Sequence, residues 1–356
     1  MMTQNALRHA DKCRFCWMCR HLCPVQLVTG RELNTPRAKG LLLSMNARGT
    51  AEFDPDMAAA MYECLLCDAC TNDCATGYQP PLFIREARTE AVVNGTAPGA
   101  VVKLIEAAEA TGSIYGEPGP CFGQEGSEVL VYIGEAAAHR APSMAKSLLA
   151  LLAKAGVSAK VLENEPVSGA MLADLEGYTE DVRRQAAACA GALNAAGLPT
   201  VVVLDSYDAE IIKQHYAEWG CAVTAEVVTA TAFAAKLLAG GRLAAKPASG
   251  VRAACHDDDR LARSLHEFEP VRALAKAAGY ELCEMFNHGR LAKSCGTALA
   301  LEYMPGIAAQ VAAARWDDLA RTGAKVLLTA SPQAYLCLGQ AVPEDCRLID
   351  LFEALL

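Results

Sequence analysis

Two groups of four cysteines have the residue type and spacing for metal chemistry. The first, "CRFCWMCRHLCP", has gaps of two, two and three residues and ends in proline, and "CLLCDACTNDC" repeats the gaps. Three thiolates at Cys-x2-Cys-x2-Cys spacing wrap one face of an iron-sulfur cubane, whereas the fourth points away and reaches a second cluster. The sequence therefore predicts two [4Fe-4S] clusters that exchange their fourth ligands.

The crosswise rule assigns each cysteine to a cluster. Cluster 1 takes Cys13, Cys16, Cys19 and Cys74, and cluster 2 takes Cys64, Cys67, Cys70 and Cys23. Zinc is the competing interpretation, because Cys-x2-Cys pairs also build tetrahedral sites, but zinc ribbons use two pairs per ion rather than two quartets. We assign these eight residues to cofactor binding and assign no catalytic residue.

Composition limits the class of protein. The chain has 356 residues, 53% of them hydrophobic, and a net charge of -9, which predicts two or three domains and disfavours a nucleic-acid partner. The first residues have no apolar core of a secretory signal, and no apolar run is long enough for a membrane span. We expect a cytoplasmic protein without a membrane span, or one that is peripheral at a membrane through its partners.

The remaining cysteines are scattered. Sixteen cysteines in a reducing compartment argue against a disulfide framework. Those without a partner at metal-binding spacing are expected to be packing residues: Cys121, Cys189, Cys221, Cys255, Cys283, Cys337 and Cys346.

Helices are expected to position the quartets. Thr35 before Pro36 and Asp54 before Pro55 combine a capping residue with a proline in the first turn. A third helix is predicted in "LFIREARTEAVVNG", with Gly95 at its C-terminal end. Residues 1–110 are therefore predicted to form a mostly helical ferredoxin domain with two [4Fe-4S] clusters.

The rest of the chain is predicted to form a linker and two α/β lobes. Residues 111–128 are rich in glycine and proline, and from Val129 short β-branched runs alternate with alanine-rich stretches, which is typical of parallel sheets. "LLAKAGVSAKVLE" resembles "LAKAAGYELCEMF", and "LNAAGLPTVVVLDS" resembles "LARTGAKVLLTASP", so the plan repeats. The predicted fold class is α+β multidomain, with lobes at 129–245 and 246–356.

The order of these parts resembles a known family. Helical ferredoxin quartets, "TPRAKG" at 35–40 and a duplicated α/β region are similar to the CCG-domain proteins. These include the B and D polypeptides of heterodisulfide reductase and the iron-sulfur polypeptides of anaerobic glycerol-3-phosphate dehydrogenase and glycolate oxidase. The insertion between the quartets resembles the helical ferredoxin domain of fumarate reductase and succinate dehydrogenase. The resemblance implies an FAD-dependent oxidase or dehydrogenase subunit as partner, with a further redox subunit as an optional one.

The sequence departs from the family at the cysteines that would hold a further, noncubane cluster. In the first lobe these positions hold Glu135, "VSG" at 167–169, Asp205 and Asp208. In the second lobe they hold Asp259, "SCG" at 294–296, Ser331 and Ala334, so Cys295 alone remains. Because Asp, Ser and Ala are poor ligands for soft iron, we expect no noncubane cluster.

The prediction is an electron-transfer subunit of an oxidoreductase complex, with FAD on the partner only, because the chain has no dinucleotide-binding motif. Two alternatives stay open. One is a heterodisulfide-reductase-like enzyme with a modified site around Cys295, either as a reactive thiol beside His288 or His256 or as a metal ligand with "HDDD" at 256–259. The other is a structural scaffold.

Overall fold

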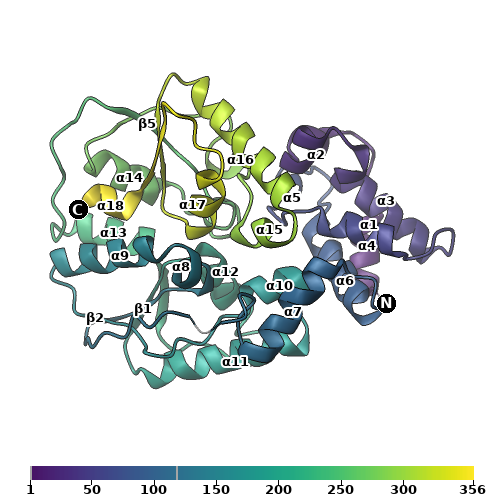
Figure 1. The fold of residues 1–356 in the computed structure, drawn as a ribbon, viewed down its shortest axis with the longest axis horizontal. Coiled ribbons are helices and arrows are strands. Elements are labelled where there is room, and N and C mark those ends of the chain that lie inside the picture. Colours follow the sequence, from purple (N-terminus) through teal and green to yellow (C-terminus); the bar gives the residue numbers. More distant parts are fainter. Residues whose placement is uncertain (1, 118) are drawn as a thin grey trace.

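A computed structural model of the chain describes residues 2–117 and 119–356. Residue 1 of the predicted first domain and residue 118 of the predicted linker lie outside the described residues. The N-terminal helices form one end of the molecule, and two α/β lobes form the other (Figure 1). Mixed helices and strands with two parallel sheets agree with the predicted fold class.

The N-terminal part is helical. Its elements are α1 Gln4–Ala10, η1 Met18–His21, α2 Pro24–Thr29, η2 Glu32–Asn34, α3 Pro36–Ala47, α4 Pro55–Tyr62, α5 Ala69–Asn72, α6 Pro80–Val93 and α7 Gly99–Thr111. The predicted caps are present, since Thr35 Oγ1 accepts a hydrogen bond from Ala38 N at 3.1 Å and Asp54 Oδ1 accepts one from Met57 N at 2.8 Å. Gly95 follows the C-cap of α6 with φ +68°, the left-handed conformation that glycine adopts readily at a helix end.

Each lobe has a four-stranded parallel sheet. The first sheet has the strand order β2-β1-β3-β4 and the second has the order β6-β5-β7-β8. The two lobes therefore have the same topology, with β1 to β4 equivalent to β5 to β8. The strands are β1 Val129–Tyr132, β2 Ala159–Lys160, β3 Thr200–Val203, β4 Glu226–Thr229, β5 Arg252–Cys255, β6 Glu281–Leu282, β7 Val326–Thr329 and β8 Arg347–Asp350. The first pair of similar sequence segments contains the equivalent strands β2 and β6, and the second pair contains β3 and β7.

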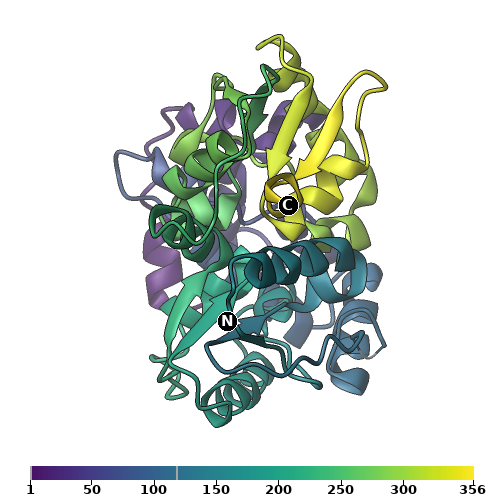
Figure 2. The same ribbon diagram turned by 90° about the vertical axis from the view of Figure 1, so that its left-hand side faces the viewer.

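Helices cover the sheets and join the lobes. They are α8 Glu135–Arg140, α9 Pro142–Lys154, α10 Ala170–Glu176, α11 Glu180–Ala195, α12 Ser206–Gln214, α13 Ala230–Ala239, η3 Arg260–Ser264, α14 Glu269–Ala277, η4 Gly289–Leu291, α15 Ala298–Tyr303, α16 Pro305–Ala320, α17 Pro332–Gly339 and α18 Leu351–Leu355. One apolar core runs through both lobes, because Leu148 and Phe233 of the first pack in the same cluster as Leu274 and Phe352 of the second. Figure 2 shows the lobes stacked on one another.

The N-terminal helices pack against both lobes. Helix α6 packs on α10 of the first lobe, and α2 packs on α16 of the second. Helix α7, which lies within the predicted first domain, places Val101 and Ile105 in the apolar core of the first lobe. No helix within the described part of the chain is both long and apolar enough to cross a membrane.

The predicted linker is packed over part of its length. Helix α7 ends at Thr111, and Ser113 and Ile114 are buried. The Ser113 hydroxyl and the Ile114 N–H both donate to Glu135 Oε1 at 2.8 Å. These bonds fasten the start of the linker to the first lobe.

Candidate iron-sulfur site

The fold brings each crossed quartet together. Burial raises the pKa of the Cys19 thiol to about 11, and three neighbouring thiols add to the rise: Cys13, Cys16 and Cys74. Burial also raises the pKa of the Cys70 thiol, with further contributions from Cys67, Cys64 and Cys23. The thiols that raise each pKa belong to the two sets that the crosswise rule assigns, and the second set also lines one small pocket.

The two loops share one backbone design. Phe15 and Trp17 in the first loop, and Leu66 and Asp68 in the second, have φ between +51° and +68° at equivalent positions of the Cys-x2-Cys-x2-Cys segment. These are four of the five non-glycine residues with positive φ in the described chain. A left-handed residue costs about 1–2 kcal/mol, so strain is concentrated where the chain must curl around a bulky group.

The same curl directs backbone N–H groups at sulfur. Phe15 N donates to Cys13 Sγ and Leu66 N donates to Cys64 Sγ, both at 3.4 Å. Hydrogen bonds to cluster sulfurs stabilise the reduced state, so both loops have a feature that tunes a cluster's potential.

The first quartet lies at the surface. Cys16 is exposed, and the apolar side chains between its cysteines are exposed as well: Phe15 by 51%, Trp17 by 41% and Met18 by 56%. The Arg37 guanidinium lies 3.8 Å from the centre of the Trp17 ring, a cation–π contact that holds the ring in place. We call Phe15, Trp17 and Met18 the exposed rim.

The second quartet lies beneath the lobes. Its four cysteines line one small pocket together with Lys39 and Asp68. Arg263 of the second lobe donates from Nε to Cys67 O at 2.6 Å, and Arg88 of α6 donates to Cys64 O at 2.6 Å. The loop is therefore fixed from two sides.

Buried cations make the second pocket suitable for an anionic cluster. Lys39 and Arg88 are each 1% exposed, and among the described residues no carboxylate oxygen forms an ion pair with either of them, although Glu63 lies near enough to act on Lys39. Lys39 Nζ donates to the carbonyls of Leu33 and Ala60, and Arg88 donates to four carbonyls, including Asp174 O at 2.5 Å. Uncompensated buried charge is costly, and a thiolate-ligated cluster carries the opposite charge. The residues present fit a [4Fe-4S] group.

Within residues 2–117 and 119–356, no three His, Cys, Asp or Glu side chains form a group that could hold one metal ion.

The positions at which the CCG-domain resemblance implies cysteines carry a hydrogen-bonded network instead. Gln333 Nε2 donates to Asp205 Oδ2 at 2.8 Å across the lobes. Asp258 accepts from Ser206 at 2.5 Å and from Ser331 at 2.7 Å, again joining the two lobes. These polar side chains bond to one another and connect the lobes.

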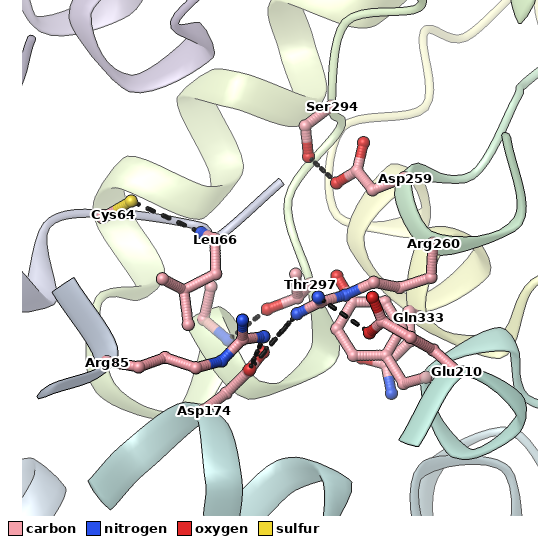
Figure 3. Close-up of polar contacts among 12 residues, drawn as sticks. Cys64, Leu66, Arg85, Asp174, Glu210, Asp259, Arg260, Ser294, Thr297 and Gln333 are labelled. Carbon is pink, nitrogen blue, oxygen red and sulfur yellow. Dashed lines mark hydrogen bonds and ion pairs between the residues drawn. The ribbon is translucent and has the colours of Figure 1, made fainter. Parts of the chain in front are cut away.

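Four more of these positions also have protein partners. Ser168 of "VSG" donates to Asp208. Asp259 forms an ion pair with Arg263. It also accepts a hydrogen bond from Ser294 at 2.5 Å, as Figure 3 shows. Asp259 thus links Ser294 to Arg263 and, through Arg263, to the loop of the second quartet.

Several acids of the first lobe are buried. Burial raises the pKa of Glu135, Glu165 and Asp205 to about 7. Glu165 accepts from the N–H groups of Ile133 and Gly134 at the end of β1. These carboxyls serve the packing of loops against the sheet.

The alternative thiol and metal sites are not assembled. Cys295 is 1% exposed, and burial raises the pKa of its thiol well above the ordinary value, which disfavours the nucleophilic thiolate. His256 Nδ1 accepts from Arg315 Nε at 3.3 Å, and His288 Nδ1 donates to Met285 O at 2.8 Å. In "HDDD", Asp257 pairs with Arg272 at 2.7 Å. The side chains that a metal would need are therefore bonded to other protein groups.

The scattered cysteines follow the packing prediction with one correction. Cys189, Cys255 and Cys337 are buried. Cys121 is exposed, so the packing interpretation is wrong for this residue, which lies in the glycine- and proline-rich segment between α7 and β1.

Sequence reasoning missed the buried cations around the second quartet. Lys39 lies in "TPRAKG", the segment cited for the resemblance, but nothing in its spacing marks it as buried. Arg88 and Arg263 lie far along the chain from the quartet that they contact, so only the folded chain brings them to it.

Comparisons with known proteins agree with this site. Residues 9–78 match the 4Fe-4S dicluster domain family, so this part of the chain is a 4Fe-4S dicluster ferredoxin domain. The chain is 24% identical over 392 residues to a protein of Chromohalobacter salexigens named "Probable membrane-anchored ferredoxin". The match covers 96% of this chain and 58% of that protein's length. An iron-sulfur, ferredoxin-like electron-transfer function is supported, whereas the CCG-domain resemblance stays a prediction.

Solved structures give weaker likenesses. Glutamate racemase RacE1 of Bacillus anthracis has a TM-score of 0.34 and 13% identity, over 65% of this chain and 79% of that one. An aspartate racemase homologue of Pyrococcus horikoshii has a TM-score of 0.27 and 11% identity, over 64% of this chain and 95% of that one. Scores this low do not establish a common fold.

Proposed function

We propose that the chain is an electron-transfer subunit with two [4Fe-4S] clusters. Cluster 1 is held by Cys13, Cys16, Cys19 and Cys74, and cluster 2 by Cys64, Cys67, Cys70 and Cys23. The observation that carries the proposal is the assembly of both crossed quartets in loops with the same curled backbone. Bound clusters supply one-electron transfer.

Cluster 1 is proposed as the entry point for electrons. Its rim of Phe15, Trp17 and Met18 is exposed, with Arg14 and Arg20 beside it. Exposed aromatics next to basic residues are suited to a protein interface. We propose an FAD-dependent dehydrogenase subunit as the partner, because the resemblance implies one and this sequence has no dinucleotide-binding motif.

Iron content tests the cofactor assignment. Anaerobically purified protein is expected to contain about eight iron and eight acid-labile sulfide per chain, because two cubanes contribute four of each. A content near four iron contradicts the second quartet, and a content near twelve indicates a further cluster in the lobes.

Co-purification tests the partner. Tagged protein from its native host is expected to retain an FAD-containing polypeptide, and substrate oxidation by that partner should bleach the cluster absorbance. A bound flavoprotein that becomes reduced without bleaching the clusters contradicts an electron-transfer role.

A further inference from the structure

Arg263 joins the second lobe to the loop of the second quartet. Its Nε donates to Cys67 O at 2.6 Å, and its Nη1 donates to Ala292 O at 2.6 Å. The side chain is 1% exposed, so solvent and salt screen its charge very little. Cys67 is one of the four cysteines that line the pocket of the second quartet. A full positive charge therefore lies against the backbone of a predicted cluster ligand.

A carboxylate on the same turn opposes the charge of Arg263. Asp259 precedes Arg263 by four residues, and the two side chains form a buried ion pair. Asp259 is 4% exposed and accepts a further hydrogen bond from Ser294 at 2.5 Å (Figure 3). The Ser294 hydroxyl in turn accepts from Gly296 N at 3.2 Å. These bonds hold the carboxylate in place beside the arginine.

Both charges act on Cys67, with opposite signs. Burial raises the pKa of the Cys67 thiol and Asp259 raises it further, whereas Arg263 lowers it. A nearby cation stabilises negative charge at the sulfur, and a nearby carboxylate destabilises it. The same holds for the extra negative charge of a reduced cluster. The second lobe therefore presents one charge of each sign to the second quartet.

The backbone that carries this pair is unusual. The segment η3 Arg260–Ser264 is a π-helical turn, a rare conformation that is often found at functional sites. His266 follows it with φ +57° and is the one described non-glycine residue with positive φ outside the two cysteine loops. Such strain persists only where the surrounding structure holds it, and it is common at functional sites. Strained backbone thus occurs in both cysteine loops and beside the turn that contacts the second one.

We propose that the Asp259–Arg263 pair sets the reduction potential of cluster 2, with Arg263 raising it and Asp259 lowering it. The inference rests on the proposed function, because it concerns a cluster held by the second quartet. Neither residue is a ligand, and both act through their charge. An electron that enters the cluster adds negative charge, which the cation stabilises and the carboxylate opposes. Asp259, at a position where the family resemblance implies a cysteine, thus serves the neighbouring cluster.

The test is a redox titration of anaerobically purified variants, followed by the two cluster signals in electron paramagnetic resonance. Arg263→Gln removes the cation, so the midpoint of cluster 2 should fall by about 59 mV, a tenfold change in the equilibrium constant for one electron. Asp259→Asn removes the anion and should raise the midpoint. The double variant should return toward the wild-type midpoint, because the two opposed effects are both absent. A purely structural role would not give shifts of opposite sign.

Two further variants control for damage to the fold. Arg263→Lys keeps the charge and should keep most of the wild-type midpoint. Arg272→Gln breaks another buried ion pair of the second lobe, but the hydrogen bonds of Arg272 go to Asp257, Glu284 and Phe268 rather than to the cysteine loop. It should lower the unfolding temperature without moving either midpoint. A midpoint shift equal to that of Arg263→Gln would show a general effect of the lobe and overturn the proposal.

Iron content separates a failure of the pair from a failure of the clusters. Wild-type protein with about four iron and one cluster signal contradicts the proposed function itself. With about eight iron and two signals, single variants that shift the midpoint in the same direction, or not at all, overturn only the role of the Asp259–Arg263 pair. If Arg263→Gln does not retain cluster 2, Asp259→Asn decides: a midpoint above that of the wild type supports the pair, and an unchanged or lower one contradicts it.

Discussion

The two cysteine quartets have nearly the same loop but opposite surroundings. Both loops place left-handed residues at the same two positions and aim an N–H group at the first sulfur. The first loop carries the exposed rim, whereas the second loop is covered by the lobes and contacted by Arg88 and Arg263. The loop fixes what is bound, and the surroundings decide what the bound group can exchange electrons with.

The largest expected effect comes from removing a ligand. Cys67→Ser should lose cluster 2, with about half the iron and complete loss of electron transfer to an acceptor, because a cubane needs all four thiolates. Cys295→Ser is the matched control, since Cys295 is also buried but lies in the lobes. It should keep full iron and nearly full transfer. Equal loss in both variants with iron retained in Cys295→Ser would place an active site in the lobes.

The next effect concerns the exposed rim. Trp17→Asn, which tolerates the left-handed backbone of this position, should slow reduction by the flavoprotein partner at least roughly tenfold while both clusters remain, because large aromatics are common interface hot spots. Phe286→Asn is the control, because Phe286 is 91% exposed on the second lobe. Similar slowing in both variants would contradict an entry point at the rim.

A smaller effect is expected on the potential of cluster 2. Lys39→Met removes a buried cation that contacts carbonyls beside the second quartet, so the reduced, more negative cluster loses stabilisation. The midpoint should fall by about 60 mV, equivalent to a tenfold change for one electron. Arg14→Met, beside the first quartet, should shift cluster 1 less, because Arg14 is exposed and its charge is screened by solvent. A redox titration with two resolved signals decides the order.

The smallest effect concerns the lobes that cover cluster 2. Burial raises the pKa of Glu135 to about 7, above its ordinary value of 4.5, so the folded state holds this proton more tightly than the unfolded state does. Stability is therefore lost as the pH rises from about 4.5 to about 7, and the full loss persists above that. Thermal unfolding should occur a few degrees lower at about pH 8 than at about pH 5.5.

Glu135→Gln isolates this contribution. An amide oxygen can still accept from Ser113 and Ile114, both of which donate to Oε1, but the amide does not ionise. The variant should unfold at a higher temperature than the wild type near pH 8 and show a smaller difference near pH 5.5. An unchanged pH dependence would show that Glu135 does not carry it.

Much of the local structure followed from the sequence. The proline-containing helix starts at Pro36 and Pro55 were confirmed, as were the two parallel sheets, because capping chemistry and β-branched runs act over a few residues. The packing of α7 on the first lobe was not foreseen, since an amphipathic pattern does not say which neighbour covers its apolar face.

The sequence determines the spacing of the cysteine ligands, whereas the tertiary structure determines what surrounds them. The gaps between cysteines predicted both quartets, since a short loop has few ways to place three sulfurs around one cubane. The burial of Lys39 and the carbonyl contacts of Arg88 and Arg263 depend on residues distant in sequence. Charge and solvation at a site sum over everything packed near it, so only the tertiary structure decided which quartet is exposed and which is enclosed.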